Sequence, residues 1–153
     1  MNYLEPNLAN ALAHFNKLTT ETKPLWGTMS PIGMIEHITD SLHLAQGKFE
    51  GVRLGIPEDK VERALKFLHS EHPMPKNFKA PFGAADEDNR NKTLDEAIQE
   101  FEAHWPDFEN HFKDNPGIRH IHPSFGNLNY EEWLRVHSKH LTHHFQQFGL
   151  IPS

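Results

Sequence analysis

The sequence predicts an all-α protein, a four-helix bundle of the up-down-down-up type with a long crossover between helices two and three. Apolar residues recur at spacings of three and four positions in four segments, which is the pattern of helices that bury one face. Capping residues precede three of these segments. A length of 153 residues suits one domain, so we expect residues 1–153 to share a single core.

Apolar stripes separated by a breaker segment predict the first two helices. The first helix is expected over residues 3–18, with its stripe made of Leu4, Leu8, Ala11, Leu12 and Phe15. Pro24 and Gly27 then interrupt the pattern. Ser30 followed by Pro31 is typical of a helix start, because serine caps free backbone amides and the first turn tolerates proline. The second helix is expected to run from there to a stop at Gly47.

The chain between residues 51 and 91 is rich in proline, glycine, asparagine and charged residues. One short helical pattern, over residues 58–68, interrupts it. We therefore predict a long crossover here. Long ordered connections in compact domains often border functional sites, so this one is expected to form a lid or rim.

Start signals open the last two helices. A capping box predicts a third helix over residues 93–113, which Pro106 is expected to kink or interrupt. Asn129 with Glu132 forms a second capping box and predicts a fourth helix over residues 129–148.

The composition excludes several classes of function. Fifteen basic residues against twenty-one acidic ones give a formal charge of -6, which argues against nucleic-acid binding. No apolar run reaches the roughly 18 residues of a membrane span, and the N-terminus lacks the pattern of a signal peptide, so a cytoplasmic protein with no membrane partner is expected. With no cysteine, the chain has neither disulfides nor thiolate ligands. Histidine, with 13 residues, is the conspicuous type.

Four histidines fall within eight positions of the fourth helix. His140 and His144 are four residues apart, about 40° around the helix axis, so both imidazoles can reach one ion. The helical wheel places His144 on the apolar face, His140 at its border and His143 outside it. His137 is expected to be a structural histidine, buried or at the rim.

A catalytic site of the zinc type commonly has three protein ligands and an open position. His37, in the segment M-I-E-H-I-T-D-S-L, lies among apolar residues of the second helix, where an unpaired imidazole is costly. We therefore predict a metal site made of His37, His140 and His144. The flanking Glu36 and Asp40 are candidates to orient a ligand ring or act as a base, with solvated surface charge as the alternative.

His122, in the loop I-H-P-S-F-G, is a further acid or base candidate, with a turn residue before Pro123 as the simpler interpretation. The other histidines show no partner at ligand spacing and are assigned to surface or packing: His14, His43, His69, His72, His104, His111 and His120.

The segment around His37 and the segment W-L-R-V-H-S-K-H-L-T-H-H-F-Q-Q-F resemble the DinB/YfiT-like superfamily of metal-dependent proteins. The H-P-x-F-G loop before the last helix is similar to a DUF1569-like branch of small proteins. The resemblance implies a four-helix bundle, often a homodimer, in which one histidine of helix two and an H-x-x-x-H pair of the last helix hold a divalent ion. These ligands correspond to His37, His140 and His144.

Superfamily members with known activity include thiol-dependent transferases and isomerases that use the ion to activate a low-molecular-weight thiol such as bacillithiol, mycothiol or glutathione. The resemblance thus implies a small-molecule substrate of this kind and a transferase or hydrolase reaction, with zinc or nickel as the first candidates for the metal and iron as another. Two alternatives stay open. One is a non-catalytic, stress-associated metal-binding bundle, and the other is a bis-imidazole haem protein.

Overall fold

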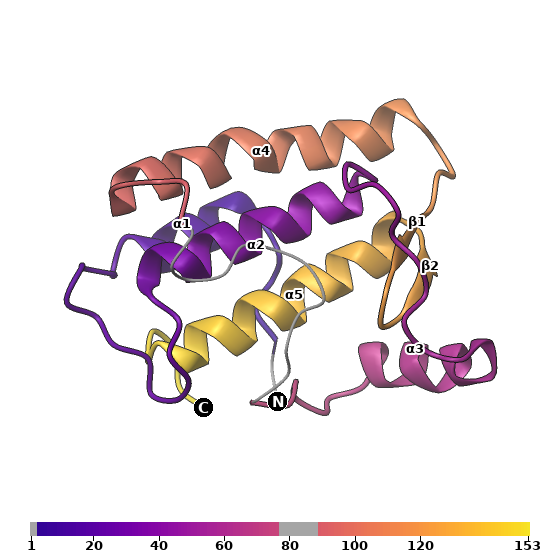
Figure 1. Ribbon diagram of the computed structural model, residues 1–153, viewed down its shortest axis with the longest axis horizontal. Helices are drawn as coiled ribbons and strands as arrows, with labels where there is room; N and C mark the ends of the chain where they lie inside the picture. Colours follow the sequence, from indigo (N-terminus) through magenta and orange to yellow (C-terminus); the bar gives the residue numbers. More distant parts are fainter. Residues whose placement is uncertain (1–2, 77–88) are drawn as a thin grey trace.

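The computed structural model describes residues 3–76 and 89–153 (Figure 1). This part of the chain is mostly helical, with five α-helices and one short β-hairpin. The elements in order are α1 (Leu8–Phe15), α2 (Pro31–Ala45), a 3-10 turn (Glu58–Lys60), α3 (Val61–His69), α4 (Leu94–Asp114), β1 (His120–His122), β2 (Gly126–Leu128) and α5 (Tyr130–Gln147). None of the helices in the described ranges is long and apolar enough to cross a bilayer.

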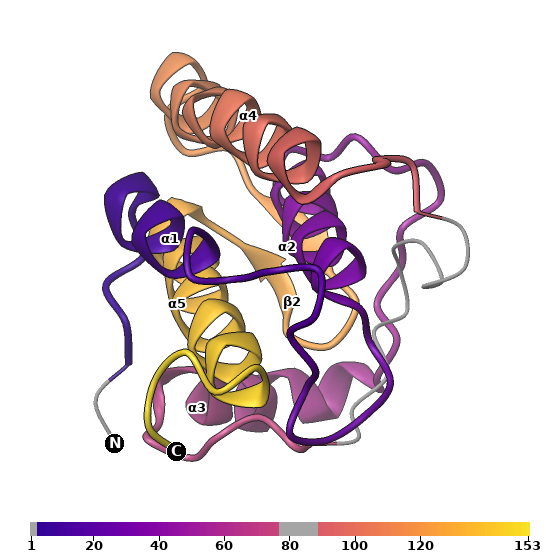
Figure 2. The same cartoon turned by 90° about the vertical axis from the view of Figure 1, so that its left-hand side faces the viewer.

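Helix α2 occupies the middle of the molecule. It packs along α4 on one side and faces α5 on the other, as Figures 1 and 2 show from two directions. The shorter α1 contacts α4, and α3 packs against α5. Helices α2 and α5 therefore face each other across the interior, which is where the candidate site lies.

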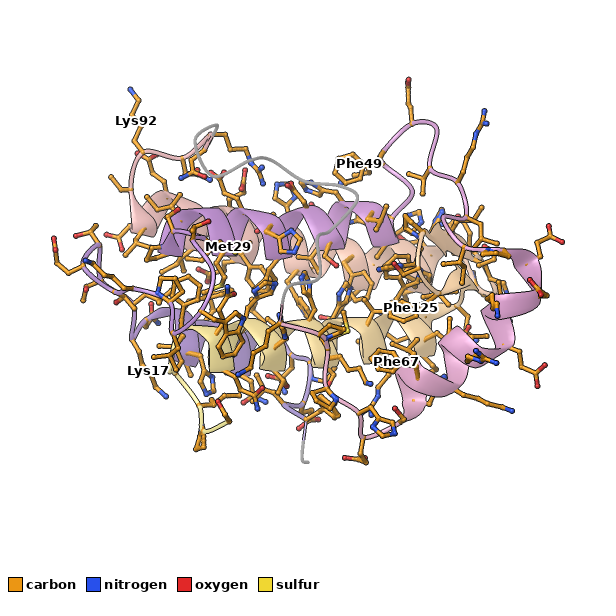
Figure 3. All side chains as sticks on the ribbon, turned by 60° about the horizontal axis from the view of Figure 1, so that its bottom comes forward. Lys17, Met29, Phe49, Phe67, Lys92 and Phe125 are labelled. Atoms are coloured by element: carbon orange, nitrogen blue, oxygen red, sulfur yellow. The ribbon has the colours of Figure 1, made fainter. Side chains whose placement is uncertain are left out.

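Aromatic side chains fill the core between these helices (Figure 3). The ring of Phe15 meets Phe101 of α4 and Phe145 of α5 edge-on, at centroid distances of 5.0 and 5.4 Å. All three are fully buried, and burial of each such side chain stabilises the fold by roughly 1.5–3 kcal/mol. Phe67 of α3 stacks on Phe125 at 6.4 Å, so the aromatic packing extends to the hairpin.

The predicted starts of the three long helices are confirmed. The side chain of Ser30 accepts a hydrogen bond from the amide of Gly33, and Thr93 accepts one from the amide of Glu96. Asn129 and Glu132 exchange both bonds of a capping box. These caps satisfy amides that have no partner inside the helix, so each boundary is specified locally.

The first helix is shorter than predicted, because α1 begins at Leu8 and ends at Phe15 rather than covering residues 3–18. Asn7 caps it. The preceding Leu4 is docked on α5 instead: its amide donates to the hydroxyl of Thr142, and its carbonyl accepts from Ser138. A backbone bonded to another helix is not available to extend α1.

The sequence predicts that Pro106 kinks or interrupts the third helix. The interruption is wrong, because α4 is continuous from Leu94 to Asp114. Proline removes one backbone hydrogen bond and leaves the carbonyl four residues earlier without its donor. Both Pro106 and that residue, Glu102, are exposed, so water can bond the carbonyl.

The all-α prediction also needs correction, because the loop before the last helix forms an antiparallel hairpin. His120 pairs with Leu128, Ile121 with Asn127, and His122 with Gly126. Gly126 has a φ of 97°, which favours glycine. Strands of three residues are too short to show the alternating pattern by which a strand is predicted.

Candidate metal centre

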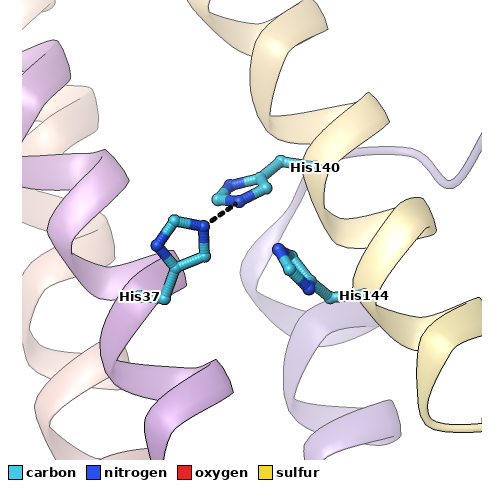
Figure 4. Close-up of side chains that lie close together, drawn as sticks. All are labelled: His37, His140 and His144. Carbon is cyan, nitrogen blue, oxygen red and sulfur yellow. Dashed lines mark hydrogen bonds between the residues drawn. The ribbon is translucent and has the colours of Figure 1, made fainter. Parts of the chain in front are cut away.

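The three histidines predicted as metal ligands lie together between α2 and α5. Figure 4 shows the ring of His37 pointing from α2 toward His140 and His144, which lie one turn apart on α5. The Nε2 atoms of His37 and His140 are 2.8 Å apart. The ring centroid of His144 lies 5.1 Å from that of His37 and 4.6 Å from that of His140. One ring nitrogen from each histidine lies within 4.8 Å of the others.

Burial keeps these imidazoles neutral. His37 and His144 are buried, whereas His140 is half-buried. The partial exposure of His140 agrees with its predicted place at the border of the apolar face. Burial lowers the pKa of His37 to about 4 and the pKa values of His140 and His144 well below the ordinary 6.5. At neutral pH each ring therefore has a nitrogen lone pair, which is the form that binds a metal ion.

Gln147 determines the tautomer of His144. The backbone carbonyl of Trp26 can only accept a hydrogen bond, so it takes one from Nε2 of Gln147 at 3.1 Å. The side-chain oxygen of Gln147 must then face Nδ1 of His144, 2.7 Å away, and that nitrogen is the protonated one. The lone pair of His144 is left on Nε2, the atom opposite the hydrogen bond. Sequence reasoning missed this residue, although it lies three positions after His144.

A comparison with protein families matches residues 3–148 to the model of the DinB superfamily. The chain belongs to the DinB superfamily. The matched region spans every element from α1 to α5 and includes all three clustered histidines. Neither the comparison with curated proteins nor the one with solved structures gives a significant match.

In this DinB-superfamily protein the two acidic candidates beside His37 lie outside the histidine cluster. The carboxylate of Glu36 accepts hydrogen bonds from the backbone amides of Arg90 and Asn91, at 3.1 and 2.7 Å, and one from the Asn91 side chain. Asp40 pairs with the guanidinium of Arg90 at 3.1 Å. The alternative of solvated surface charge is wrong, because the exposed fractions of Glu36 and Asp40 are 1% and 5%.

The guanidinium of Arg90 links three carboxylates, because besides Asp40 it pairs with Glu100 of α4 at 2.8 Å and with Glu36 at 4.0 Å. The guanidinium thus ties the chain before α4 to both Glu100 and the buried acids of α2. The pairing lowers the pKa of Glu100 despite partial burial, which acts in the opposite direction. Sequence reasoning missed Arg90, whose signal is a single basic residue at the end of the predicted crossover.

His122, the third acid or base candidate, is buried against Phe125 and Trp133, and its Nδ1 accepts a hydrogen bond from the amide of Ser124 at 3.0 Å. It does not belong to the cluster. Burial lowers its pKa to about 3. It ends strand β1 and begins the turn before β2, since its carbonyl accepts a hydrogen bond from the amide of Phe125 at 3.2 Å, which agrees with its interpretation as a turn residue before Pro123.

His137 is buried, as its structural assignment predicts. Its ring centroid lies 4.6 Å from that of Phe108, and the rings of Trp105 and Trp133 are farther away, at 5.9 and 6.0 Å. Within the described ranges its Nε2 atom has no hydrogen-bond partner. Burial lowers its pKa to about 3.

Among the remaining histidines, the prediction of no partner at ligand spacing is wrong for His111 and His120, whereas the contact of His43 with His104 is the packing role assigned to them. The Nε2 atoms of His111 and His120 are 2.8 Å apart, and the rings of His43 and His104 meet edge-on at 4.6 Å. Each pair joins residues from different elements, so no local spacing predicted it. His69 and His72 are exposed, and His14 stacks on Phe145.

Proposed function

We propose that this protein is a metal-dependent enzyme that holds one divalent transition-metal ion through His37, His140 and His144. The convergence of one ring nitrogen from each histidine within 4.8 Å supports this proposal. Three neutral imidazoles suit zinc, nickel and iron, and we propose zinc or nickel first.

The donor set fits such an ion. Imidazole nitrogens bind at about 2.0–2.1 Å, which separates two ligands of one ion by about 3 Å. The 2.8 Å between Nε2 of His37 and Nε2 of His140 is close to this value, so small ring movements suffice. The hydrogen bond from His144 to Gln147 fixes the second ring nitrogen of a ligand, as outer partners do in metal sites.

The proposed reaction is a transfer or hydrolysis that uses a low-molecular-weight thiol or water. A bound dication lowers the proton affinity of such a ligand. The buried rings of His37 and His144 restrict access from two sides, and the partly exposed His140 indicates the side from which a small molecule approaches. The thiol as substrate rests on likeness to the superfamily.

We retain Glu36, Asp40 and His122 as proposed proton-transfer residues. The hydrogen bonds of Glu36 and the ion pair of Asp40 also support an anchoring role for those two. The competing function is a metal that only joins α2 to α5 and takes no substrate. The ligands come from both helices, which is consistent with either function.

We further propose that the helices form the up-down-down-up bundle expected for the family, in a DUF1569-like branch and as a homodimer. The course of the ribbon supports the bundle, since α2 and α4 run in the same direction and α5 runs in the opposite one (Figure 1).

Elemental mass spectrometry of the purified chain tests the metal site. We expect about one tightly bound transition-metal ion per chain as purified, lost in His37→Ala and in His140→Ala and kept in His69→Ala, which removes an exposed histidine of α3. A chain that binds no metal at neutral pH even after reconstitution would refute the site. Thiol-transfer assays on the loaded protein then separate the functions: turnover lost in His37→Ala supports an enzyme, and metal-dependent stability without turnover supports the joining role.

A further inference from the structure

His111 and His120 form a second imidazole pair, near the C-terminal end of α2. His111 lies in the last turn of α4, and His120 begins strand β1. Their Nε2 atoms are 2.8 Å apart, the same separation as between His37 and His140. We propose that His111 and His120 form a second, weaker site for a divalent transition-metal ion, separate from the three-histidine cluster.

The ring of His120 packs closely against a glycine, Gly47. Gly47 has a φ of 70°, and a Cβ atom there would lie 2.6 Å from both Nδ1 and Cε1 of His120. Only glycine allows this edge of the ring to pack so closely on the backbone. With Nδ1 and Cε1 of His120 against Gly47, the other ring nitrogen, Nε2, lies 2.8 Å from Nε2 of His111.

The surrounding charges favour a cation. Gly47 follows the C-terminal end of α2, and His111 lies at the C-terminal end of α4, so both helices direct their partial negative charge toward the pair. Figure 1 shows these two helix ends on the same side of the molecule, beside the hairpin. The nearby Arg119 is paired with Glu132 at 3.3 Å, which offsets its charge.

The pair is also accessible to solvent. Both rings are half-buried, so water can reach them as additional ligands, and His120 also borders a surface hollow of about 350 Å³. Burial and the neighbouring His111 lower the pKa of His120, which favours the neutral ring that binds a metal ion. In the free protein one imidazole donates its Nε2 proton to the other. An ion takes the place of this proton, which moves through solvent to Nδ1 of the donor ring, so that both Nε2 atoms bind.

Titration of the full-length chain with zinc, followed by competition with a chromophoric chelator, tests the proposal. We expect two zinc ions per unmodified chain, the second bound more weakly. His111→Gln and His120→Gln should each lose the weaker equivalent and keep the tighter one. His69→Gln, which removes an exposed single histidine, should keep both. Circular dichroism verifies that each variant is folded.

Nuclear magnetic resonance of the imidazole Cε1 protons gives a second measurement on the unmodified chain. The signals of His111 and His120 should shift with the second equivalent of zinc. Two results would overturn the proposal. One is that the unmodified chain binds a single equivalent of zinc and His120→Gln still binds it. The other is that the second equivalent persists in both His111→Gln and His120→Gln. Failure of the three-histidine site gives a different result: one equivalent, lost in His120→Gln and retained in His37→Ala.

Discussion

Nδ1 of His144 donates a hydrogen bond to the side-chain oxygen of Gln147 across 2.7 Å, while the amide group of the same glutamine is held by the carbonyl of Trp26. The carbonyl of Trp26 and the side-chain oxygen of Gln147 can each only accept a hydrogen bond. Together they orient the imidazole of His144 and place its lone pair on Nε2. The hydrogen bond connects a predicted metal ligand to the loop before α2.

Replacement of this glutamine is therefore expected to weaken metal binding without removing a ligand. Gln147→Leu keeps the bulk of the side chain but leaves the orientation and tautomer of His144 unspecified. Loss of such a partner typically lowers metal affinity about 10- to 100-fold. Chelator competition with zinc measures the change. Gln146→Leu is the matched control, because that buried side chain bonds the carbonyl of Pro152 instead. Equal affinities in both variants and the unmodified chain would contradict the role of Gln147.

Arg90 is expected to contribute more to stability than a surface cation. Arg90→Met removes the guanidinium that pairs with the buried Glu36 and Asp40, and breaking a buried pair costs about 3–5 kcal/mol. Because Arg90 is about one-third exposed, we expect a smaller loss, of roughly 2 kcal/mol in the free energy of unfolding. Urea unfolding measures it.

Arg119→Met is the control for Arg90, since Arg119 is more exposed than Arg90 and pairs with the single carboxylate of Glu132, so its loss should cost about 1 kcal/mol or less. If both variants lose the same amount, the link between Arg90 and the acids of α2 contributes nothing beyond a surface ion pair.

His137→Phe is expected to stabilise the protein at pH 7. The histidine ring is enclosed by Trp105, Phe108 and Trp133, and in the described part of the chain its Nε2 atom has no partner. Phenylalanine keeps the aromatic packing and removes a buried polar atom, which is worth roughly 1 kcal/mol. Thermal or urea unfolding measures the gain. A loss of stability would indicate that Nε2 is satisfied by a buried water molecule.

The buried histidines also predict sensitivity to acid. His122 and His137 have pKa values of about 3 in the folded protein against 6.5 for an ordinary histidine. Between these values the unfolded chain binds more protons, so stability is full above about pH 6.5 and is lost as the pH falls toward 3. Urea unfolding at pH 7, 6 and 5 should show a declining free energy of unfolding.

The same substitution gives the control for this pH dependence. In His137→Phe the decline should be shallower by up to about 1.4 kcal/mol per pH unit, the contribution of one proton. An unchanged slope would show that His137 is not a source of the acid sensitivity.

Local features of the sequence predicted most of the helical framework. The capping residues Ser30, Thr93 and Asn129 each bond an amide three residues away, so the helix starts could be read from short spacings. The adjacency of His140 and His144 follows in the same way from their separation by four residues on one helix.

The sequence by itself thus determined the helix boundaries around these caps, the pairing of His140 with His144 and the apolar face on which they lie. The tertiary structure decided which distant groups meet: His37 with His140, Arg90 with Asp40, Gln147 with Trp26, and His111 with His120. The physical reason is range. A cap or a one-turn pair depends on helix geometry over a few residues, whereas a contact between elements depends on how whole helices pack against one another.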